Sequence, residues 1–317
     1  MEGKPVVCIG ILVADVVGRP VRMLPEAGRL VLVEEMGLYT GGCAANTATA
    51  LARLGIPVEI IGRVGHDPFG DFLVRELEHR GIGTAGITRD SDTGTSATMV
   101  MVDPDGERRF IHYIGANARL TLEQIAPERI QNAAIVHVAG ALVLPGLDGL
   151  PTARLLQQAR EAGAITFLDT VWDDTGRWMK LLKSCLPYVD YFVPSLAEAR
   201  ALTGRQAPEE VATALLEEGV GTVALKMGAD GCLVQSRDRP ALHVPAFEVQ
   251  VVDATGAGDA FAAGFIAGVY LGWPLVDTAR LANAVGALCV TGVGASGNVA
   301  SLEETLAFMR SARVREH

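Results

Sequence analysis

Short apolar runs alternate with amphipathic segments along most of this 317-residue chain. β-Branched runs indicate buried strands, and segments with apolar positions three or four apart, closed by glycine, indicate helices. The expected strands cover residues 5–13, 58–62, 134–138, 165–169, 188–193 and 222–227, with a hairpin partner at 231–235. The expected helices cover residues 44–54, 68–80, 151–162, 196–202, 206–218, 260–271, 276–291 and 302–312. This alternation predicts an α/β fold, with a mostly parallel sheet and helices on both of its faces.

One hairpin signal does not fit that rhythm. Residues 95–102 and 108–114 flank the sequence Asp103-Pro104-Asp105-Gly106, which is typical of a turn between two strands. Together with residues 15–39, of which 31–39 alternate loosely like a strand, this hairpin predicts a small separate sheet, a lid. We therefore expect an α/β domain of residues 1–13, 40–94 and 116–317 and a small β lid of residues 14–39 and 95–115.

Composition and charge narrow the classes of partner. Hydrophobic residues make up 49% of the chain, which is ample for a large core, and the net charge is −10. Because binding to phosphates of nucleic acid requires a basic face, nucleic acid is not an expected partner. The apolar stretches 260–276 and 281–300 are broken by glycines and other interrupting residues, so we expect core elements and no membrane partner.

Cysteine usage and the first residues predict a cytoplasmic protein. The five cysteines form no C-x-x-C pair and their number is odd, which is typical of a reduced compartment rather than a disulfide framework or zinc site. The six histidines include no H-x-x-x-H or H-E-x-x-H spacing. Residues 1–10 lack the length and cleavage site of a signal peptide, so we expect no targeting segment there.

The most informative segment is residues 253–265, where three small residues precede a carboxylate and an uncharged apolar run. Small residues allow a sharp turn, and the first N–H groups of the helix that follows have no intrahelical partner. Gly256, Ala257 and Gly258 therefore predict an anion site at the start of a buried helix. A carboxylate at that place, Asp259, fits a general base that takes a hydroxyl proton beside a transferring phosphoryl group.

Further acidic residues and turn residues fall at the carboxyl ends of the expected strands, the edge where ligands bind in α/β sheets. They are Asp15, Gly41, Gly42, Asp169, Ser195, Glu198 and Gly228. One edge thus gathers carboxylates and anion-binding backbone, as a phosphotransferase site requires. Because the chain has no G-x-x-x-x-G-K-[ST] sequence, we expect ATP to be held by the glycine turn and helix start rather than by a P-loop.

Two segments together resemble the signatures of the PfkB family of ribokinase-like sugar kinases. One is Gly41-Gly42-Cys43-Ala44-Ala45-Asn46, continuing through Ala52-Arg53-Leu54-Gly55, and the other is Asp253-Ala254-Thr255-Gly256-Ala257-Gly258-Asp259-Ala260-Phe261. Landmarks between them follow in the family's order at residues 62–70, 95–114, 195–198 and 226–231, so the resemblance covers nearly the whole chain. It implies ATP-dependent phosphorylation of a sugar-like alcohol, with a lid that closes over the sugar and excludes water.

The resemblance also implies a role for each matching residue. Asp259 would be the base, and the anion hole for the γ-phosphoryl group would be Gly256, Ala257 and Gly258. The residues that would bind sugar hydroxyls are Asp15, Gly41, Gly42 and Asn46. Those that would border the nucleotide are Lys226, Gly228, Gly231 and Asn283. Mg²⁺ would be held through water by Glu198 and Asp169, and a monovalent cation, usually K⁺, would be framed by Asp253, Thr255, Cys289, Gly294 and Asn298.

Three positions depart from the family pattern. Ser195 stands where the N-x-x-E motif has Asn, Cys43 replaces a residue that is often polar, and residues 140–142 lack the acidic sugar contact of ribokinase. We therefore expect intact phosphate chemistry and a sugar pocket that can differ from that of ribokinase. Arg108 and Arg109 in the hairpin are expected to be solvated, with contact to a phosphorylated substrate as the alternative.

Other functions stay open at this point. A nucleoside kinase on the same fold is less favoured because Tyr39 is the only aromatic residue near the first signature and base stacking calls for more. A sugar or nucleotide sensor without turnover is less favoured because the base is present. An NAD oxidoreductase is less favoured. The chain matches the G-x-G-x-x-G fingerprint only at residues 81–86 and 292–297, and neither match has the strand–loop–helix context that the fingerprint requires. A homodimer through the lid is also compatible with the sequence, since exposed strand edges tend to be covered.

Overall fold

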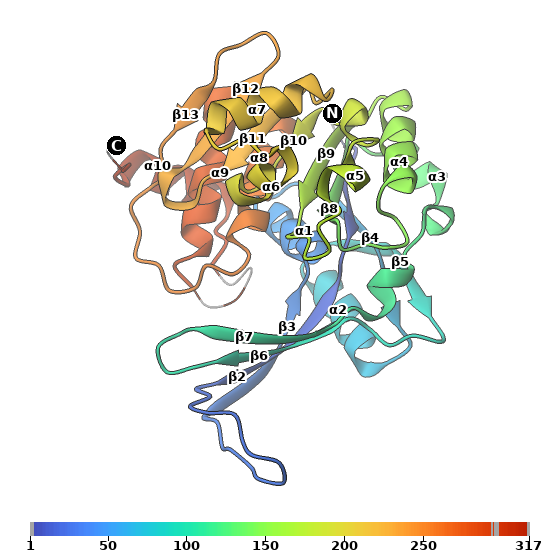
Figure 1. Ribbon diagram of the computed structural model, residues 1–317, viewed down its shortest axis with the longest axis vertical. Coiled ribbons are helices and arrows are strands. Elements are labelled where there is room, and N and C mark those ends of the chain that lie inside the picture. The colour runs from blue at the N-terminus through green and yellow to red at the C-terminus, as the bar shows by residue number, and fades with distance from the viewer. Residues whose placement is uncertain (1–2, 293, 295–297, 316–317) are drawn as a thin grey trace.

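The computed structural model describes residues 3–292, 294 and 298–315, which build two sheets (Figure 1). Within these described residues, the larger sheet has nine strands in the order β13-β12-β11-β10-β9-β8-β1-β4-β5. Its parallel strands are β1 (Val6–Gly10), β4 (Val58–Gly65), β5 (Gly83–Asp90), β8 (Ile135–Ala141), β9 (Ile165–Thr170), β10 (Tyr191–Phe192) and β11 (Thr222–Lys226). Two antiparallel strands extend one edge: β12 (Cys232–Ser236) and β13 (Leu242–Val244).

Helices cover both faces of the larger sheet, and a large apolar cluster lies under each set. One face carries α1 (Cys43–Arg53), α2 (Pro68–His79), α8 (Ala257–Tyr270), α9 (Leu275–Cys289) and α10 (Leu302–Ser311). The other carries α3 (Pro127–Gln131), α4 (Leu150–Glu161), α5 (Trp178–Leu182), α6 (Leu196–Thr203) and α7 (Pro208–Glu217). Short 3₁₀ turns are η1 (Gly115–Arg119), η2 (Leu122–Gln124), η3 (Leu186–Tyr188) and η4 (Gly228–Asp230). In the part of the chain that the structure describes, no helix is long and apolar enough to span a membrane.

Helix α8 packs closely along α9 because glycines on α8 leave room for the neighbouring backbone. A Cβ on Gly264 would lie 2.8 Å from Cα of Ala282, and one on Gly268 would lie 2.9 Å from Cα of Thr278. Residues 260–269 of α8 are all buried, as expected for a helix that is apolar on every side. This packing fixes the start of α8, which carries the candidate site.

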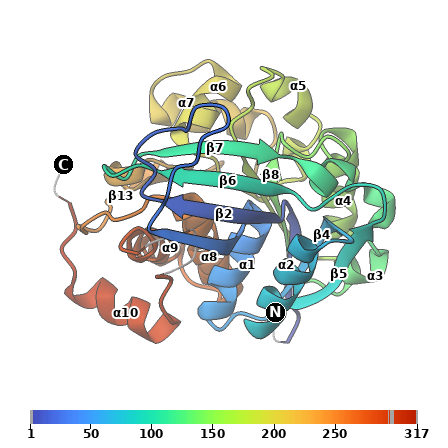
Figure 2. The same ribbon diagram turned by 90° about the horizontal axis from the view of Figure 1, so that it is seen from below.

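A smaller sheet projects from the larger one, and Figure 2 shows its strands side by side. Its order is β3 (Glu35–Gly41), β2 (Val13–Arg19), β6 (Ala97–Val102) and β7 (Arg108–Tyr113). Strand β2 pairs antiparallel with β3 and parallel with β6, and β6 pairs antiparallel with β7. We call these strands the lid sheet and the rest of the described chain the body.

The chain passes from the body to the lid sheet through Ile11 and Leu12, between β1 and β2. The side chain of Asn117 in η1 holds the backbone of Leu12: Oδ1 accepts from the N–H at 3.1 Å and Nδ2 donates to the carbonyl at 2.9 Å. An amide side chain thus replaces a strand partner for two buried backbone groups. This contact fixes the root of the lid sheet.

The predicted α/β architecture is confirmed, including the separate small sheet. The expected strand 5–13 is wrong in detail, because the strand is interrupted at Ile11 and Leu12 and the chain then enters the other sheet as β2. The expected strand 188–193 shortens to residues 191–192, because η3 occupies the preceding segment. Strands β5 and β13 were not expected: β5 is a partly exposed edge strand and β13 has three residues, so neither has a long apolar run.

Candidate active site

The turn at residues 256–258 lies where the chain enters α8. Gly256 is the N-cap and has a φ of 74°, a left-handed conformation that favours glycine. Helix α8 begins at Ala257, so the N–H groups of its first turn have no acceptor within the helix. Together with the helix dipole, they make the start of α8 suitable for a negatively charged group. This is the local geometry that the sequence predicts.

Asp259 stands in the first turn of α8 and is oriented by α1. Nδ2 of Asn46 donates to Oδ2 of Asp259 at 2.8 Å, and the Thr47 hydroxyl donates to the backbone carbonyl of Asp259 at 3.4 Å. Burial raises the pKa of the Asp259 carboxyl above its usual value, although Asn46 and Lys226 act against the shift. A carboxylate with a raised pKa and one oriented oxygen is suited to accept a proton from a hydroxyl.

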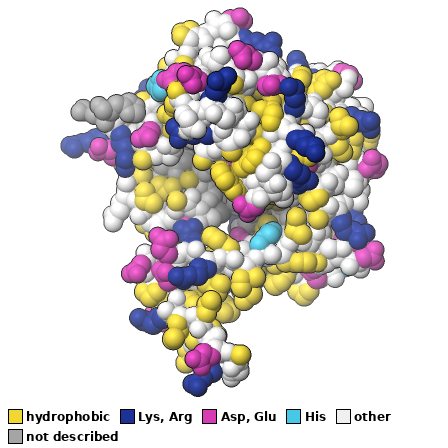
Figure 3. Space-filling model, viewed as in Figure 1, with side chains coloured by type: hydrophobic (Ala, Val, Ile, Leu, Met, Phe, Trp, Pro, Cys, Tyr) yellow, Lys and Arg dark blue, Asp and Glu magenta, His cyan; other side chains and the backbone are white. Residues whose placement is uncertain are grey.

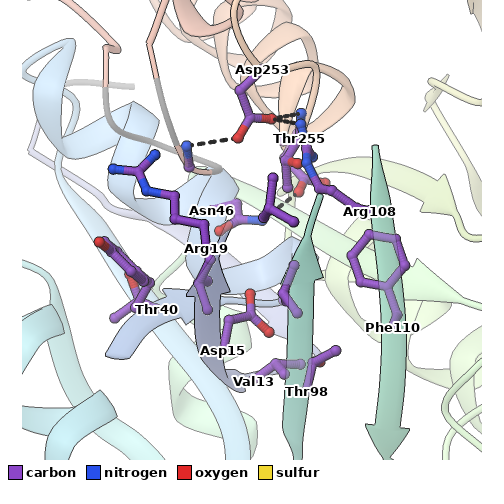
Figure 4. Close-up of a pocket in the computed structure, with 18 of the residues that line it drawn as sticks. Val13, Asp15, Arg19, Thr40, Asn46, Thr98, Arg108, Phe110, Asp253 and Thr255 are labelled. Carbon is purple, nitrogen blue, oxygen red and sulfur yellow. Dashed lines mark hydrogen bonds and ion pairs between the residues drawn. The ribbon is translucent and has the colours of Figure 1, made fainter. Parts of the chain in front are cut away.

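A cavity of about 440 Å³ opens beside Asp259, between the lid sheet and the body. Figure 3 shows a hollow in the surface between the body and the lid sheet below it, and Figure 4 shows residues that line the cavity. We call it the lid cavity. Strand β2 turns alternate side chains into it, as the pleat of a strand requires: Val13, Asp15, Val17 and Arg19. Other predicted site residues in its lining are Gly42, Asn46, Asp253, Thr255, Gly256, Asp259 and Gly294.

Two polar groups in the lid cavity are suited to bind a ligand. Oδ1 of Asn46 is buried and has no hydrogen-bond partner among the residues that the structure describes, an arrangement that costs about 1–3 kcal/mol unless a ligand donates to it. Burial raises the pKa of Asp15 to about 6, against a hydrogen bond from Thr98. Because both groups can accept hydrogen bonds, the hydroxyls of a polyol would match them.

Gly41 and Gly42 act through the absence of a side chain. A Cβ on Gly41 would lie 2.0 Å from Oδ2 of Asp15, so a larger residue would displace that carboxylate. Gly42 is the N-cap of α1 with a φ of 92°, and its Cβ would lie 2.4 Å from the carbonyl oxygen of Ile11. Gly42 therefore shapes the wall of the lid cavity, while Gly41 makes room for Asp15.

A second cavity, of about 260 Å³, lies on the other side of the same turn. We call it the helix cavity, because α8 and α9 form much of its wall. Its lining contains the residues predicted to border the nucleotide, Lys226, Gly228, Gly231 and Asn283. Ala257 and Gly258 also line it, whereas Gly256 and Asp259 line the lid cavity. The turn therefore separates two cavities.

Asn283 also has a structural role at the helix cavity. Its Nδ2 donates to the carbonyl oxygens of Val244 and Pro245 at 2.9 and 3.0 Å. These bonds connect the middle of α9 to the end of β13, so Asn283 both lines the cavity and holds its wall in place.

Lys226, Asp169 and Glu198 form a charged cluster near the ends of β9 and β11. Nζ of Lys226 lies 2.8 Å from both carboxylate oxygens of Asp169. Burial alone would lower the pKa of the Lys226 ammonium, but Asp169 and Glu198 outweigh it, so the pKa is raised. Burial raises the pKa of the Asp169 carboxyl to about 7, against the charge of Lys226, so the charged ammonium faces a carboxyl that titrates near neutral pH.

Glu198 contributes to helix capping. Its Oε2 accepts from the N–H of Ser195 at 2.9 Å and from the Thr170 hydroxyl at 3.1 Å. The Ser195 hydroxyl accepts in return from the N–H of Glu198 at 3.2 Å, which completes a capping box for α6. Serine thus supplies a helix cap at the position where the family motif has Asn.

The predicted Mg²⁺ ligands fit a metal unequally. Both oxygens of Asp169 accept from Lys226, so Asp169 is poorly placed to hold a cation as well. Glu198 remains compatible with contact through water, which Mg²⁺ commonly retains. Among the described residues, no group of three or more His, Cys, Asp or Glu side chains is arranged to hold a metal directly.

Asp253 connects several parts of the loop before α8. Oδ1 accepts from the N–H of Thr255 at 2.6 Å and from the guanidinium of Arg108, and Oδ2 accepts from the N–H of Gly294 at 2.9 Å (Figure 4). Burial would raise the pKa of Asp253, but the N–H donors of Gly294 and Thr255 and the charge of Arg108 lower it. Asp253 is therefore a charged group that organises this loop.

The remaining residues of the predicted monovalent cation site divide into two groups. Sγ of Cys289 donates to the carbonyl oxygen of Thr255 at 3.7 Å, so Cys289 lies with Asp253, Thr255 and Gly294. Asn298 is exposed, and its Nδ2 donates to the Thr291 hydroxyl at 3.1 Å.

Sequence reasoning included Asp15 on β2 but missed the contribution of β7. The expectation that Arg108 is solvated is wrong, because its side chain is 21% exposed and pairs with Asp253. Arg109 is solvated as expected: it is 60% exposed and lies 3.6 Å from Asp103. The missed signal is the alternation along β7, which turns Arg108 and Phe110 toward the lid cavity and Arg109 away from it.

The glycine patterns that prompted a dinucleotide interpretation lack its structural context. Residues 81–86 follow the end of α2 and run into β5, the reverse of the strand–loop–helix order. The match at 292–297 includes 293 and 295–297, which lie outside the described residues.

Comparisons with known proteins extend over most of the chain. The model of the pfkB family of carbohydrate kinases matches residues 4–301. A 2-dehydro-3-deoxygluconokinase of Bacillus subtilis is 28% identical over 299 residues, 91% of this chain and 92% of that protein. An ATP-dependent ribose-1-phosphate kinase of Halopiger xanaduensis is 36% identical over 281 residues, 86% of this chain and 87% of that protein. The structure of Arabidopsis thaliana ribokinase with ribose and ATP aligns with a TM-score of 0.85 and 26% identity, covering 97% of this chain and 99% of that one.

Proposed function

Because this chain belongs to the pfkB family of carbohydrate kinases, we propose that it transfers the γ-phosphoryl group of ATP to a hydroxyl of a sugar or sugar derivative in the lid cavity. The observation that carries this proposal is the position of the 256–259 turn. Gly256 and Asp259 face the lid cavity, and Ala257 and Gly258 face the helix cavity. An alcohol in one cavity and a nucleotide in the other would therefore meet at the first turn of α8.

Asp259 is the proposed general base. Its carboxylate removes the hydroxyl proton as the oxygen attacks the γ-phosphorus, and Asn46 keeps it oriented through the 2.8 Å hydrogen bond. The raised pKa makes the carboxylate a better proton acceptor. The N–H groups at the start of α8 stabilise the charge on the transferring group, which is the main task of a protein in phosphoryl transfer.

The sugar is proposed to bind along the polar end of the lid cavity. Asp15 and Asn46 would accept hydrogen bonds from its hydroxyls, and the lid sheet would keep water away from the reacting atoms. The named activities of the relatives favour a ribose, fructose or keto-deoxy sugar type of acceptor, with or without a phosphate.

The nucleotide is proposed to occupy the helix cavity. Apolar side chains such as Phe247 and Val249 would contact the base, and Gly228 and Gly231 would allow close approach of the backbone. Mg²⁺ bound with the nucleotide would neutralise phosphate charge, with Glu198 contacting it through water. A monovalent cation such as K⁺ is proposed beside Asp253 and Thr255, and its effect is part of the test below.

An assay of ADP release tests the proposal. The acceptors are ribose, fructose, 2-dehydro-3-deoxygluconate, ribose 1-phosphate and adenosine, each with MgATP and with or without K⁺. We expect ADP release that depends on one of the sugars, which would exclude a sensor without turnover. ADP release that no acceptor stimulates would contradict a kinase, and a nicotinamide absorbance change in its place would favour an oxidoreductase.

A nucleoside kinase is the second candidate, and one observation favours it more than the sequence did. Tyr39 and Phe110 both line the lid cavity, so an aromatic base has two rings to contact rather than one. The adenosine arm of the assay decides between the candidates.

A homodimer through the lid is also proposed. Strand alternation places Met36, Met99, Ile111 and Tyr113 on the face opposite the lid cavity, and each is more than half exposed. Figure 3 shows apolar side chains among charged ones on the lid. Such a patch is typical of an interface, and light scattering on the wild type and on Ile111→Asp would show whether the mass falls to one chain.

A further inference from the structure

The ion pair of Arg108 and Asp253 joins the lid sheet to the loop before α8, and the proposed transfer step does not use it. Arg108 is the first residue of β7, and Asp253 lies three residues before the N-cap of α8. Among the described residues, it is the only ion pair between the lid strands and the body. Arg108 therefore links β7 of the lid sheet directly to the loop before α8.

Asp253 carries this link to the phosphate-binding turn. The same carboxylate accepts from the N–H of Thr255, the residue before Gly256, and from the N–H of Gly294. The side chains of Arg108 and Asp253 are 21% and 11% exposed, so water screens the pair only in part. Removing the guanidinium would leave a largely buried carboxylate without its counter-charge while two backbone groups still depend on it.

We propose that Arg108 is a positioning residue that couples the lid sheet to the 253–256 loop. The guanidinium contacts Asp253 and fixes the backbone that leads into the turn beside Asp259. The sheet that lines the proposed acceptor site thereby also holds the phosphate site in place, which favours transfer to an acceptor enclosed there over transfer to water. The expected effect of Arg108 on turnover rests on the proposed kinase activity. Its expected effect on the loop rests on the observed contacts alone.

Arg109 provides a matched control on the same strand. It carries the same charge, points to the opposite face and pairs with Asp103 inside the hairpin. Arg109→Gln changes the charge of the lid by the same amount as Arg108→Gln and leaves the loop before α8 untouched.

Amide hydrogen exchange on the full chain without ligands tests the coupling independently of catalysis. In Arg108→Gln we expect the amides of Thr255 and Gly294 to exchange about tenfold faster than in the wild type, the effect of losing about 1.4 kcal/mol of local stability. Arg109→Gln is expected to leave both rates unchanged. Equal rates in the wild type and Arg108→Gln would overturn the inference.

Kinetics with the best acceptor of the panel test the consequence. Arg108→Gln is expected to lower kcat/KM for the acceptor about tenfold or more with an unchanged KM for ATP, and Arg108→Lys is expected to recover most of the loss, because it keeps the charge. The double variant Arg108→Gln/Asp253→Asn is expected to be no worse than the more impaired single variant, since both changes remove one interaction.

The outcomes separate the two proposals. Additive losses in the double variant would mean that Arg108 contacts the acceptor independently of Asp253, and the coupling would be rejected. A wild type without acceptor-dependent ADP release would reject the kinase proposal, while the exchange rates would still decide whether Arg108 holds the loop.

Discussion

The lid cavity and the helix cavity share one turn but differ in how they are built. The lid cavity gathers polar groups from separate elements, including Asp15 on β2, Asn46 on α1 and Asp259 on α8. The helix cavity is lined largely by small and apolar residues of α8, α9 and the segment after β13. The first is suited to select a pattern of hydroxyls, and the second to bury a flat ring. In the proposed kinase, substrate selection in each cavity is thus separated from the chemistry at the turn.

The strongest test of this separation is Asp259→Asn. We expect kcat to fall about 10²–10⁴-fold, because the amide cannot take the hydroxyl proton, while KM for ATP stays close to the wild-type value. Steady-state kinetics and thermal unfolding would be measured together. The control is Asp238→Asn, an exposed carboxylate outside both cavities, and full activity in Asp259→Asn would remove the assigned base.

The next prediction concerns Asp15 in the lid cavity and is measured as the dependence of folding stability on pH. The pKa of Asp15 is about 6 in the folded protein against 3.8 ordinarily, because burial disfavours its charged form. Above pH 6 the charged carboxylate therefore lowers folding stability, and the cost disappears as the pH falls through 6 toward 4. Asp15→Asn is expected to be about 1–3 kcal/mol more stable than the wild type at pH 7.5 and nearly equal to it at pH 4. Urea unfolding at both pH values would measure this, and acceptor KM should rise in the variant.

Asp253→Asn is expected to change the stability at neutral pH in the opposite direction from Asp15→Asn. The pKa of Asp253 is lowered in the folded protein, so its charge stabilises the fold at neutral pH and the benefit is lost as the pH falls below its ordinary value. The variant is therefore expected to be less stable than the wild type at pH 7.5. The same pH trend in both variants would contradict the different environments assigned to the two carboxylates.

A change confined to the helix cavity should affect the nucleotide alone. Gly286 on α9 lines this cavity, and the nearest atom to a Cβ there would be the carbonyl oxygen of Ala257 at 3.5 Å, an ordinary contact. Gly286→Leu is expected to raise KM for ATP about tenfold by filling the cavity, with acceptor KM unchanged. Gly286→Ala is the control, since it favours the helix and takes little space. Equal effects on both substrates would show that the cavities are not independent.

The smallest expected effect lies outside both cavities. Ser195→Ala removes the N-cap of α6 and is expected to cost about 1 kcal/mol of stability. Ser195→Asn should retain the stability, because Asn is also a good cap. Chemical unfolding of both variants, alongside the kinetics, would show whether Ser195 has a role beyond the helix end.

Local patterns predicted the elements whose signals are local. The Gly256 turn and α8 depend on neighbouring residues, so their types and spacing appear in the sequence. The ion pairs of Lys226 with Asp169 and of Arg108 with Asp253 join distant segments, and no spacing rule gives the partner of a buried charge. The residue roles that were assigned from the family resemblance stay predictions. So do K⁺ binding, the dimer and the cytoplasmic location.

Strand alternation in the lid sheet has a consequence for how this protein can change. Val17, Val100 and Phe110 reach the lid cavity from strands, whereas the proposed base and its hydrogen-bond donor lie on helices. A library randomised at these positions would sample new acceptors while the groups on α1 and α8 stayed constant. The fold therefore permits retuning of preference by drift or by laboratory selection without rebuilding the reaction centre.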